Sequence, residues 1–198
     1  MATPLEIRNR RLANDYQEML NIKSPMIDWT IRYGNAPVVE AYEITLNLRT
    51  VVSEAPEYVT QHKLLLSLPD NYPQAAPSIE FLSTPPFHPN WYPAGKWCFG
   101  TWEMSEGLGH HVVRMMRTLQ FDPEITNEYS PANREANGWY MRFKNSGIFP
   151  TDTQILPDPS RAYQQAQKRF SMQNFSEAAP DKPSDENNEP PKSRFKLM

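Results

Sequence analysis

The apolar residues of the first 25 positions recur at helical spacing. Five of them share one helical face: Leu5, Leu12, Tyr16, Met19 and Leu20. Thr3-Pro4 followed by Glu6 is typical of a helix start, with Thr3 as the N-cap and Glu6 closing a capping box. Because a residue before proline avoids helical geometry, the predicted helix ends near Ser24-Pro25.

Apolar and polar residues then alternate with the period of β-strands. The clearest strand is predicted over 41–49, where every second residue from Tyr42 to Leu48 is apolar. Three more strands are predicted at 26–31, at 64–68 and at 79–81. Since the strands are consecutive and their connections short, we expect an antiparallel meander.

Residues 72–100 form a proline-rich segment that also contains many aromatic residues. It is too apolar to be disordered, so we expect an irregular, packed loop that carries function. A helical stripe follows at 108–119, and another helix is predicted over 131–143 with Ser130 as its N-cap. The expected fold class is α+β, with an N-terminal helix, a four-stranded antiparallel meander, an active-site loop segment and C-terminal helices.

The chain is predicted to consist of one domain and a C-terminal extension. Its 198 residues fit a single domain, which we place at 1–150. Residues 151–175 are predicted to be a partly helical extension, with a helical piece at 160–170. Residues 176–198 contain almost no core-forming side chains and are predicted to be a disordered tail.

Composition and charge argue against several classes of protein. The net charge of −3 disfavours a nucleic-acid binder that uses a broad basic surface. No apolar run is long enough to cross a bilayer and no signal peptide is evident, so we expect a cytoplasmic protein without a membrane partner. The single cysteine excludes an internal disulfide and a thiolate metal cluster.

That single cysteine, Cys98, is the main candidate for chemistry. A lone intracellular cysteine is most often a small buried hydrophobe. Here Asn90 lies eight residues upstream, across a proline-rich loop. An asparagine amide can donate a hydrogen bond to the oxyanion that forms when a thiolate attacks an acyl centre. The context therefore favours a nucleophilic cysteine.

A cysteine hydrolase would also need a histidine base. His88 is the nearest candidate in sequence, but Pro89 after it indicates a fixed turn. His62 lies on a predicted strand, and His110 and His111 open a predicted helix, where adjacent side chains point in different directions. A hydrolase is therefore a weak hypothesis and a metal site a weaker one.

One combination of residues is similar to the core motif of the ubiquitin-conjugating enzyme family: Tyr72-Pro73, Pro77, Phe81, His88-Pro89-Asn90, Tyr92, Gly95 and Cys98. In that family the active cysteine follows the asparagine by eight residues, as here. Residues 130–136 also resemble the family motif at the start of the next helix. The resemblance covers roughly residues 5–143 and implies the family's UBC fold, with residues 1–150 as its catalytic domain.

The resemblance implies thioester chemistry at Cys98. An activating enzyme passes a ubiquitin-like modifier to the cysteine sulfur, and an amine of an acceptor protein then attacks the thioester. No cofactor or metal is implied. Asn90 is expected to donate to the oxyanion or to hold the loop that shapes the site.

Four further residues receive roles from the same resemblance. His88 and Pro89 are expected to brace the turn before Asn90. Ser130 matches the position of a residue that flanks the cysteine and orients or helps deprotonate the incoming lysine, and Glu128 is a second candidate for that task. Ser130 as a helix N-cap is an equally strong interpretation, and the two roles are compatible.

Several departures from the family pattern indicate a divergent member, of the type found in bacterial operons that pair conjugating, activating and deconjugating enzymes. Gln74 follows Tyr72-Pro73 where the family often has a hydrophobic contact for RING-type ligases, so the ligase partner is uncertain. The stretch 99–107 is short, with Trp102 out of register, and the usual loop is not evident at 53–61. The alternative function is a non-catalytic UBC-like scaffold that binds a ubiquitin-like protein or a partner enzyme.

Overall fold

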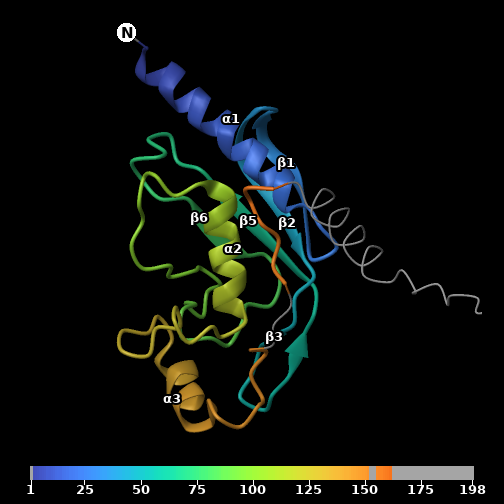
Figure 1. Ribbon diagram of the computed structural model, residues 1–198. Coiled ribbons are helices and arrows are strands. Elements are labelled where there is room, and N and C mark those ends of the chain that lie inside the picture. Colours follow the sequence, from blue (N-terminus) through green and yellow to red (C-terminus); the bar gives the residue numbers. More distant parts are fainter. Residues whose placement is uncertain (1, 152–154, 162–198) are drawn as a thin grey trace, which may run out of the picture.

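The computed structural model describes residues 2–151 and 155–161 of the chain. Two helices cover one face of a twisted antiparallel sheet, and a third helix lies beyond one end of that sheet (Figure 1). Nearly all of the predicted helical piece at 160–170 and the whole predicted tail at 176–198 lie outside the described residues. The predicted division of the chain at 150 and 175 therefore stays a prediction.

The N-terminal helix α1 (Pro4–Ile22) begins as predicted. The Thr3 hydroxyl accepts from the Glu6 N–H at 3.2 Å, and the Glu6 carboxylate accepts from the Thr3 N–H at 2.7 Å. The predicted apolar face is partly wrong, because Leu5 and Leu20 are exposed. The chain turns into the first strand at Ser24, and the buried side of α1 includes a charged residue, Asp15, that no apolar pattern can reveal.

The four predicted strands are present and pair in sequence order, as a meander. They are β1 (Ile27–Asn35), β2 (Val38–Leu46), β5 (His62–Ser67) and β6 (Ser78–Phe81). Alternating residues such as Ile44, Leu64 and Leu66 are fully buried against the helices. Two strands were not predicted, β3 (Thr50–Val51) and β4 (Tyr58–Val59), which pair only with each other. Two residues are too few to produce a periodic signal.

Helix α2 (Leu108–Leu119) packs beside α1 over the sheet, and helix α3 (Arg134–Phe143) lies below it (Figure 1). A second, smaller apolar cluster holds α3: Val51, Phe121, Trp139, Tyr140 and Phe149. The prediction of Ser130 as N-cap is wrong. The N-cap is Asn133, whose side chain accepts from the Ala136 N–H at 3.0 Å.

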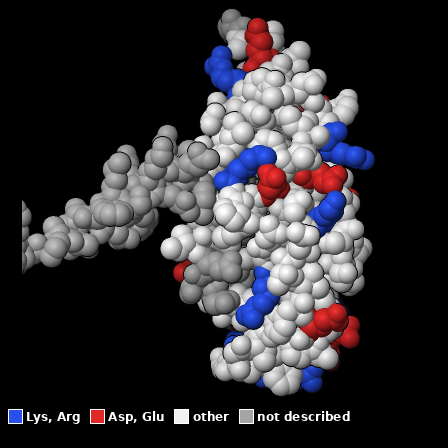
Figure 2. All heavy atoms as spheres, turned by 90° about the vertical axis from the view of Figure 1, so that its right-hand side faces the viewer, with Lys and Arg blue, Asp and Glu red and all other residues white. Residues whose placement is uncertain are grey.

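Charged side chains are scattered over the face shown in Figure 2, with acidic and basic residues intermingled. No broad basic area is visible on that face, in keeping with the net charge of −3. None of the described helices combines the length and the apolar character that a membrane span requires.

Candidate active site around Cys98

The eight-residue interval between Asn90 and Cys98 is a closed loop. The Cys98 N–H donates to the Asn90 carbonyl at 2.8 Å, and Trp91 pairs with Trp97 in a β-bridge. Gly95 turns the loop with a φ of +92°, a conformation that favours glycine. The eight-residue spacing of Asn90 and Cys98 thus corresponds to a closed loop in which the backbones of the two residues are hydrogen-bonded.

Aromatic side chains form the floor beneath this loop. The Trp91 and Trp97 rings are buried and stacked, with centroids 5.7 Å apart. His88 packs on Trp91 and on Phe121, the latter at 4.1 Å between centroids. This packing holds the buried side of the 90–98 loop in place. Cys98 itself is only partly buried.

Asn90 uses both ends of its buried amide to hold the facing loop. Its Oδ1 accepts from the Asn127 N–H at 2.8 Å, and its Nδ2 donates to the Ile125 carbonyl at 3.2 Å. Of the two roles predicted for Asn90, these contacts favour holding the loop. An amide nitrogen carries two protons and the bond to Ile125 uses one, so an oxyanion could still receive the other.

An open cavity of about 490 Å³ joins Cys98 to the facing loop. It is lined by Asn90, by residues 98–100 and by residues 123–129. Two carboxylates belong to this lining. Glu124 is paired with Arg117 at 2.9 Å and Glu128 with Lys144 at 3.0 Å. The cavity at Cys98 is therefore bordered by two carboxylates, each of which is paired with a basic side chain.

His88 and Pro89, which are predicted to brace the turn before Asn90, both make hydrogen bonds there. The buried His88 Nδ1 accepts from the Asn90 N–H at 2.9 Å, and burial lowers the His88 pKa to about 3. The ring is therefore neutral and has no proton to give at Nδ1. The Pro89 carbonyl accepts from the N–H groups of Ala132 and Asn133 at 2.8 and 3.1 Å.

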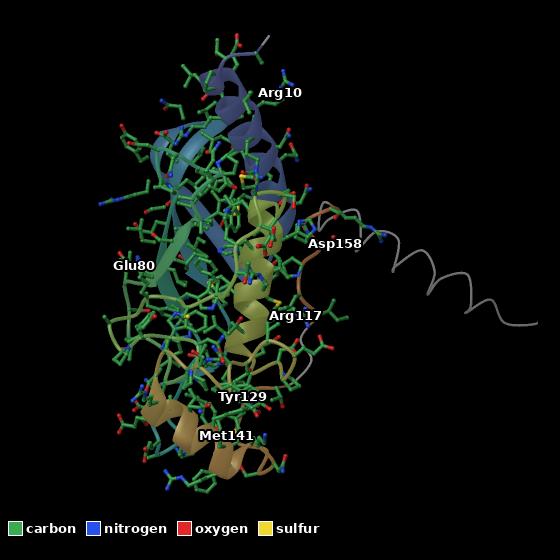
Figure 3. The ribbon with its side chains drawn as sticks, turned by 90° about the vertical axis from the view of Figure 1, so that its left-hand side faces the viewer. Arg10, Glu80, Arg117, Tyr129, Met141 and Asp158 are labelled. Atoms are coloured by element: carbon green, nitrogen blue, oxygen red, sulfur yellow. The ribbon has the colours of Figure 1, made fainter. Side chains whose placement is uncertain are left out.

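The loop opposite Cys98 presents Glu128 rather than Ser130 to the cavity. Ser130 is exposed, and its N–H donates to the Asn127 Oδ1 at 2.9 Å while its carbonyl accepts from the Asn127 Nδ2 at 2.6 Å. These two bonds hold a turn that leaves Tyr129 97% exposed between α2 and α3 (Figure 3).

Sequence reasoning missed Glu124, Asn127 and Tyr129 as cavity residues. They lie in an irregular loop that no periodicity marks, and their nearness to Cys98 comes from the bonds to Asn90. In the sequence, only the acidic residues Glu124 and Glu128 ahead of Ser130-Pro131 pointed to this loop as a functional one.

Trp102 and Gln74, which depart from the family pattern, have clear places in the structure. The Trp102 Nε1 donates to the Pro73 carbonyl at 2.8 Å, and its ring lies 5.9 Å from that of Tyr72. Trp102 thus holds the segment after Cys98 against the Tyr-Pro motif. Gln74 lines an open groove together with Pro4, Leu5 and Arg8 at the start of α1.

No family model matches the chain. Curated relatives with the name ubiquitin-conjugating enzyme E2 2 do match. Those of Candida albicans and Saccharomyces cerevisiae are 29% identical to the chain over 150 and 148 residues, covering 71% and 75% of it and 73% and 80% of the relative. That of Mycosarcoma maydis is 33% identical over 78 residues, or 39% of the chain and 42% of the relative. A solved structure, described as Plasmodium vivax ubiquitin conjugating enzyme E2, matches with a TM-score of 0.45 and 21% identity, covering 55% of this chain and 98% of its own.

Proposed function

We propose that this protein is a ubiquitin-conjugating-type transferase that accepts a ubiquitin-like modifier on Cys98 as a thioester and transfers it to an acceptor amine. The predicted class of enzyme agrees with the name of the fungal relatives, and the match to the chain covers most of the length of those relatives. The observation that carries the proposal is the closed 90–98 loop, which places the only cysteine at a cavity opposite a loop bearing carboxylates.

The reaction consists of two acyl transfers. The Cys98 thiolate attacks the thioester carbonyl on the activating enzyme, and collapse of the tetrahedral intermediate releases that enzyme's thiolate. An acceptor amine then attacks the new thioester, loses a proton and expels the Cys98 thiolate, leaving an amide. Because a thiolate leaves readily, the protein's task is to position the reactants and stabilise the oxyanion, for which we assign Asn90 Nδ2 as the donor.

Glu128 is the residue we assign to the acceptor amine. It lines the cavity, whereas Ser130 does not. A carboxylate near the thioester attracts a lysine ammonium and can receive its proton during attack. Its pairing with Lys144 at 3.0 Å shows that it already holds one ammonium group in the free protein.

The partners of the reaction follow from this proposal. They are an activating enzyme, a ubiquitin-like modifier and an acceptor protein. Gln74 at the Tyr-Pro groove leaves the use of a RING-type ligase uncertain. The relatives reported above are fungal and give no support to the bacterial type. That assignment and the cytoplasmic location stay predictions.

The deciding experiment mixes the full chain with a cognate activating enzyme, its modifier and ATP. We expect an adduct that reducing agents cleave, that is lost in Cys98→Ala, and that becomes a reductant-resistant oxygen ester in Cys98→Ser. The scaffold alternative predicts binding of the modifier or partner without any covalent adduct. Absence of the adduct with a verified cognate set would favour the scaffold.

A further inference from the structure

The two chain neighbours of Cys98 both pack against α2. The rings of Trp97 and Phe99 lie 4.9 and 5.2 Å from the ring of His111, and Trp102 lies 5.1 Å from it on a third side. His111 is fully buried, and burial lowers the pKa of its ring. The His111 ring thus packs against three aromatic residues of the active-site segment.

Arg114, one turn further along α2, holds the backbone immediately after Cys98. Its Nη1 donates to the Phe99 carbonyl at 2.8 Å. Its Nε and Nη2 donate to the two Glu106 oxygens at 2.8 and 2.7 Å, and Nη2 also lies 3.1 Å from His111 Nδ1. The planar guanidinium contacts all three partners at once, which a lysine ammonium on its flexible stem cannot do.

This contact fixes the backbone one residue after Cys98, in addition to the ring contacts that Phe99 and Trp102 make with His111. Gly100 has a φ of +79°, and no atom lies within 4 Å of the position a Cβ would take. On the other side, the Cys98 N–H donates to the Asn90 carbonyl. The 90–98 loop therefore fixes the cysteine from one side, and Arg114 fixes it from the other.

We propose that Glu106, His111 and Arg114 are positioning residues that hold Cys98 over its cavity, with Arg114 as the central member. This inference rests on the proposed function for its catalytic consequence, although the geometric claim stands on the contacts alone. Without the Arg114 bond, Phe99 and Gly100 gain freedom and the thioester carbonyl spends less time in line with the acceptor. Discharge of the thioester at saturating acceptor should then slow by about tenfold. The acceptor concentration that gives half of the maximal discharge rate should stay unchanged.

The sole cysteine offers a direct test that needs no modifier. A nitroxide methanethiosulfonate label on Cys98 of the full chain reports the mobility of the loop through its spectrum. We expect a more mobile label in Arg114→Gln and in Arg114→Lys, and an intermediate one in Glu106→Gln. Arg142→Gln is the matched control, because Arg142 is exposed and its contacts, with the Gly138 carbonyl and the Phe143 ring, lie within its own helix α3.

Spectra are compared at a temperature where circular dichroism shows every variant folded, so that unfolding does not imitate loop mobility. Spectra of Arg114→Gln and Arg114→Lys that superimpose on that of the parent protein would overturn the proposal. So would discharge of Arg114→Lys to free lysine at the parental rate. If the parent itself forms no thioester with a verified cognate set, the proposed function fails, and the label spectra alone decide on the positioning role.

Discussion

At the scale of single residues, Asn90 connects the two halves of the site. Replacing it by alanine leaves the Asn127 N–H and the Ile125 carbonyl without their partner in a partly buried place. Unmade hydrogen bonds of this kind cost about 1–3 kcal/mol each. We expect Asn90→Ala to lower the free energy of unfolding by about 2–4 kcal/mol, measured by chemical denaturation.

The same variant should still load the modifier but discharge it slowly, because the facing loop no longer holds its place. Asn90→Asp is the informative comparison, since it keeps an acceptor for the Asn127 N–H and loses only the donor to Ile125. Failure of Asn90→Ala to load at all would show that the residue is needed to build the site rather than for transfer.

Burial of His88 should make the free energy of unfolding depend on pH. Its pKa is about 3 in the folded chain because it is buried, whereas an unfolded histidine titrates near 6.5. Between these values the unfolded chain binds a proton that the folded chain excludes. The His88 contribution is therefore complete above pH 6.5 and is lost as the pH falls, at up to about 1.4 kcal/mol per pH unit.

His88→Asn tests that dependence, because asparagine can still accept from the backbone N–H two residues on. Unfolding by denaturant between pH 7 and pH 4 should show a shallower loss of stability in the variant than in the parent. His62 and His111, whose pKa values burial also lowers, remain in both proteins. Equal slopes would contradict the assignment to His88.

At the scale of elements, α2 receives its N-terminal cap from α1. Its own N-cap residue, Gly107, has no side chain to offer. Instead the Asp15 Oδ1 accepts from the Leu108 N–H at 3.0 Å, and the Glu18 Oε2 accepts from the Gly109 N–H at 2.9 Å. Two carboxylates at a helix N-terminus also suit the helix dipole. Capping thus couples the two helices that cover the sheet.

Asp15 should be the more important of the two capping residues. It is buried, and its second oxygen accepts from Tyr72 at 2.7 Å and from Arg11 at 2.8 Å. Asp15→Ala removes the cap and takes one hydrogen-bond partner each from Tyr72 and Arg11, so we expect a loss of about 3 kcal/mol in a thermal or denaturant unfolding experiment. Glu18→Ala, at a less buried position, is the control and should cost about 1 kcal/mol. Equal costs would argue against the buried network.

At the scale of the whole molecule, the chain has two apolar clusters of unequal size. The larger lies between the sheet and the helices α1 and α2, and the smaller joins α3 to Val51, Phe121 and Phe149. Because few groups link α3 to the large cluster, α3 should open locally before the molecule unfolds. The site spans this boundary, since its facing loop lies between α2 and α3.

Trp139→Ala tests this organisation. Trp139 is buried and packs against Phe87 and Phe149, so the truncation should cost the small cluster about 3–5 kcal/mol. Hydrogen exchange followed by mass spectrometry should show faster exchange in α3 and the facing loop, with protection retained in β2 and β5. Uniformly faster exchange through the sheet would mean that the clusters unfold together.

The sequence by itself determined the features that arise from neighbours in the chain. The Thr3–Glu6 capping box, the alternation in β2 and the length of the 90–98 loop act over fewer than ten residues, and each is present. The start of α3 was misplaced by the same local reasoning, because Ser130 and Asn133 are both suitable caps. The Asn127 bonds to Ser130 and the Pro89 bonds to Ala132 and Asn133 hold this segment out of the helix, so that the helix begins after Asn133.

Tertiary structure decided which residues face Cys98. Asn127 lies 37 residues from Asn90 and Arg114 lies 15 residues from Phe99, and no periodic pattern specifies such pairs. The packing of α2 on the sheet and the burial of His88 and His111 determine them instead. The sequence thus singled out Cys98 and the loop that carries it, whereas the carboxylates of the facing loop and the contacts of Arg114 depend on how the elements pack.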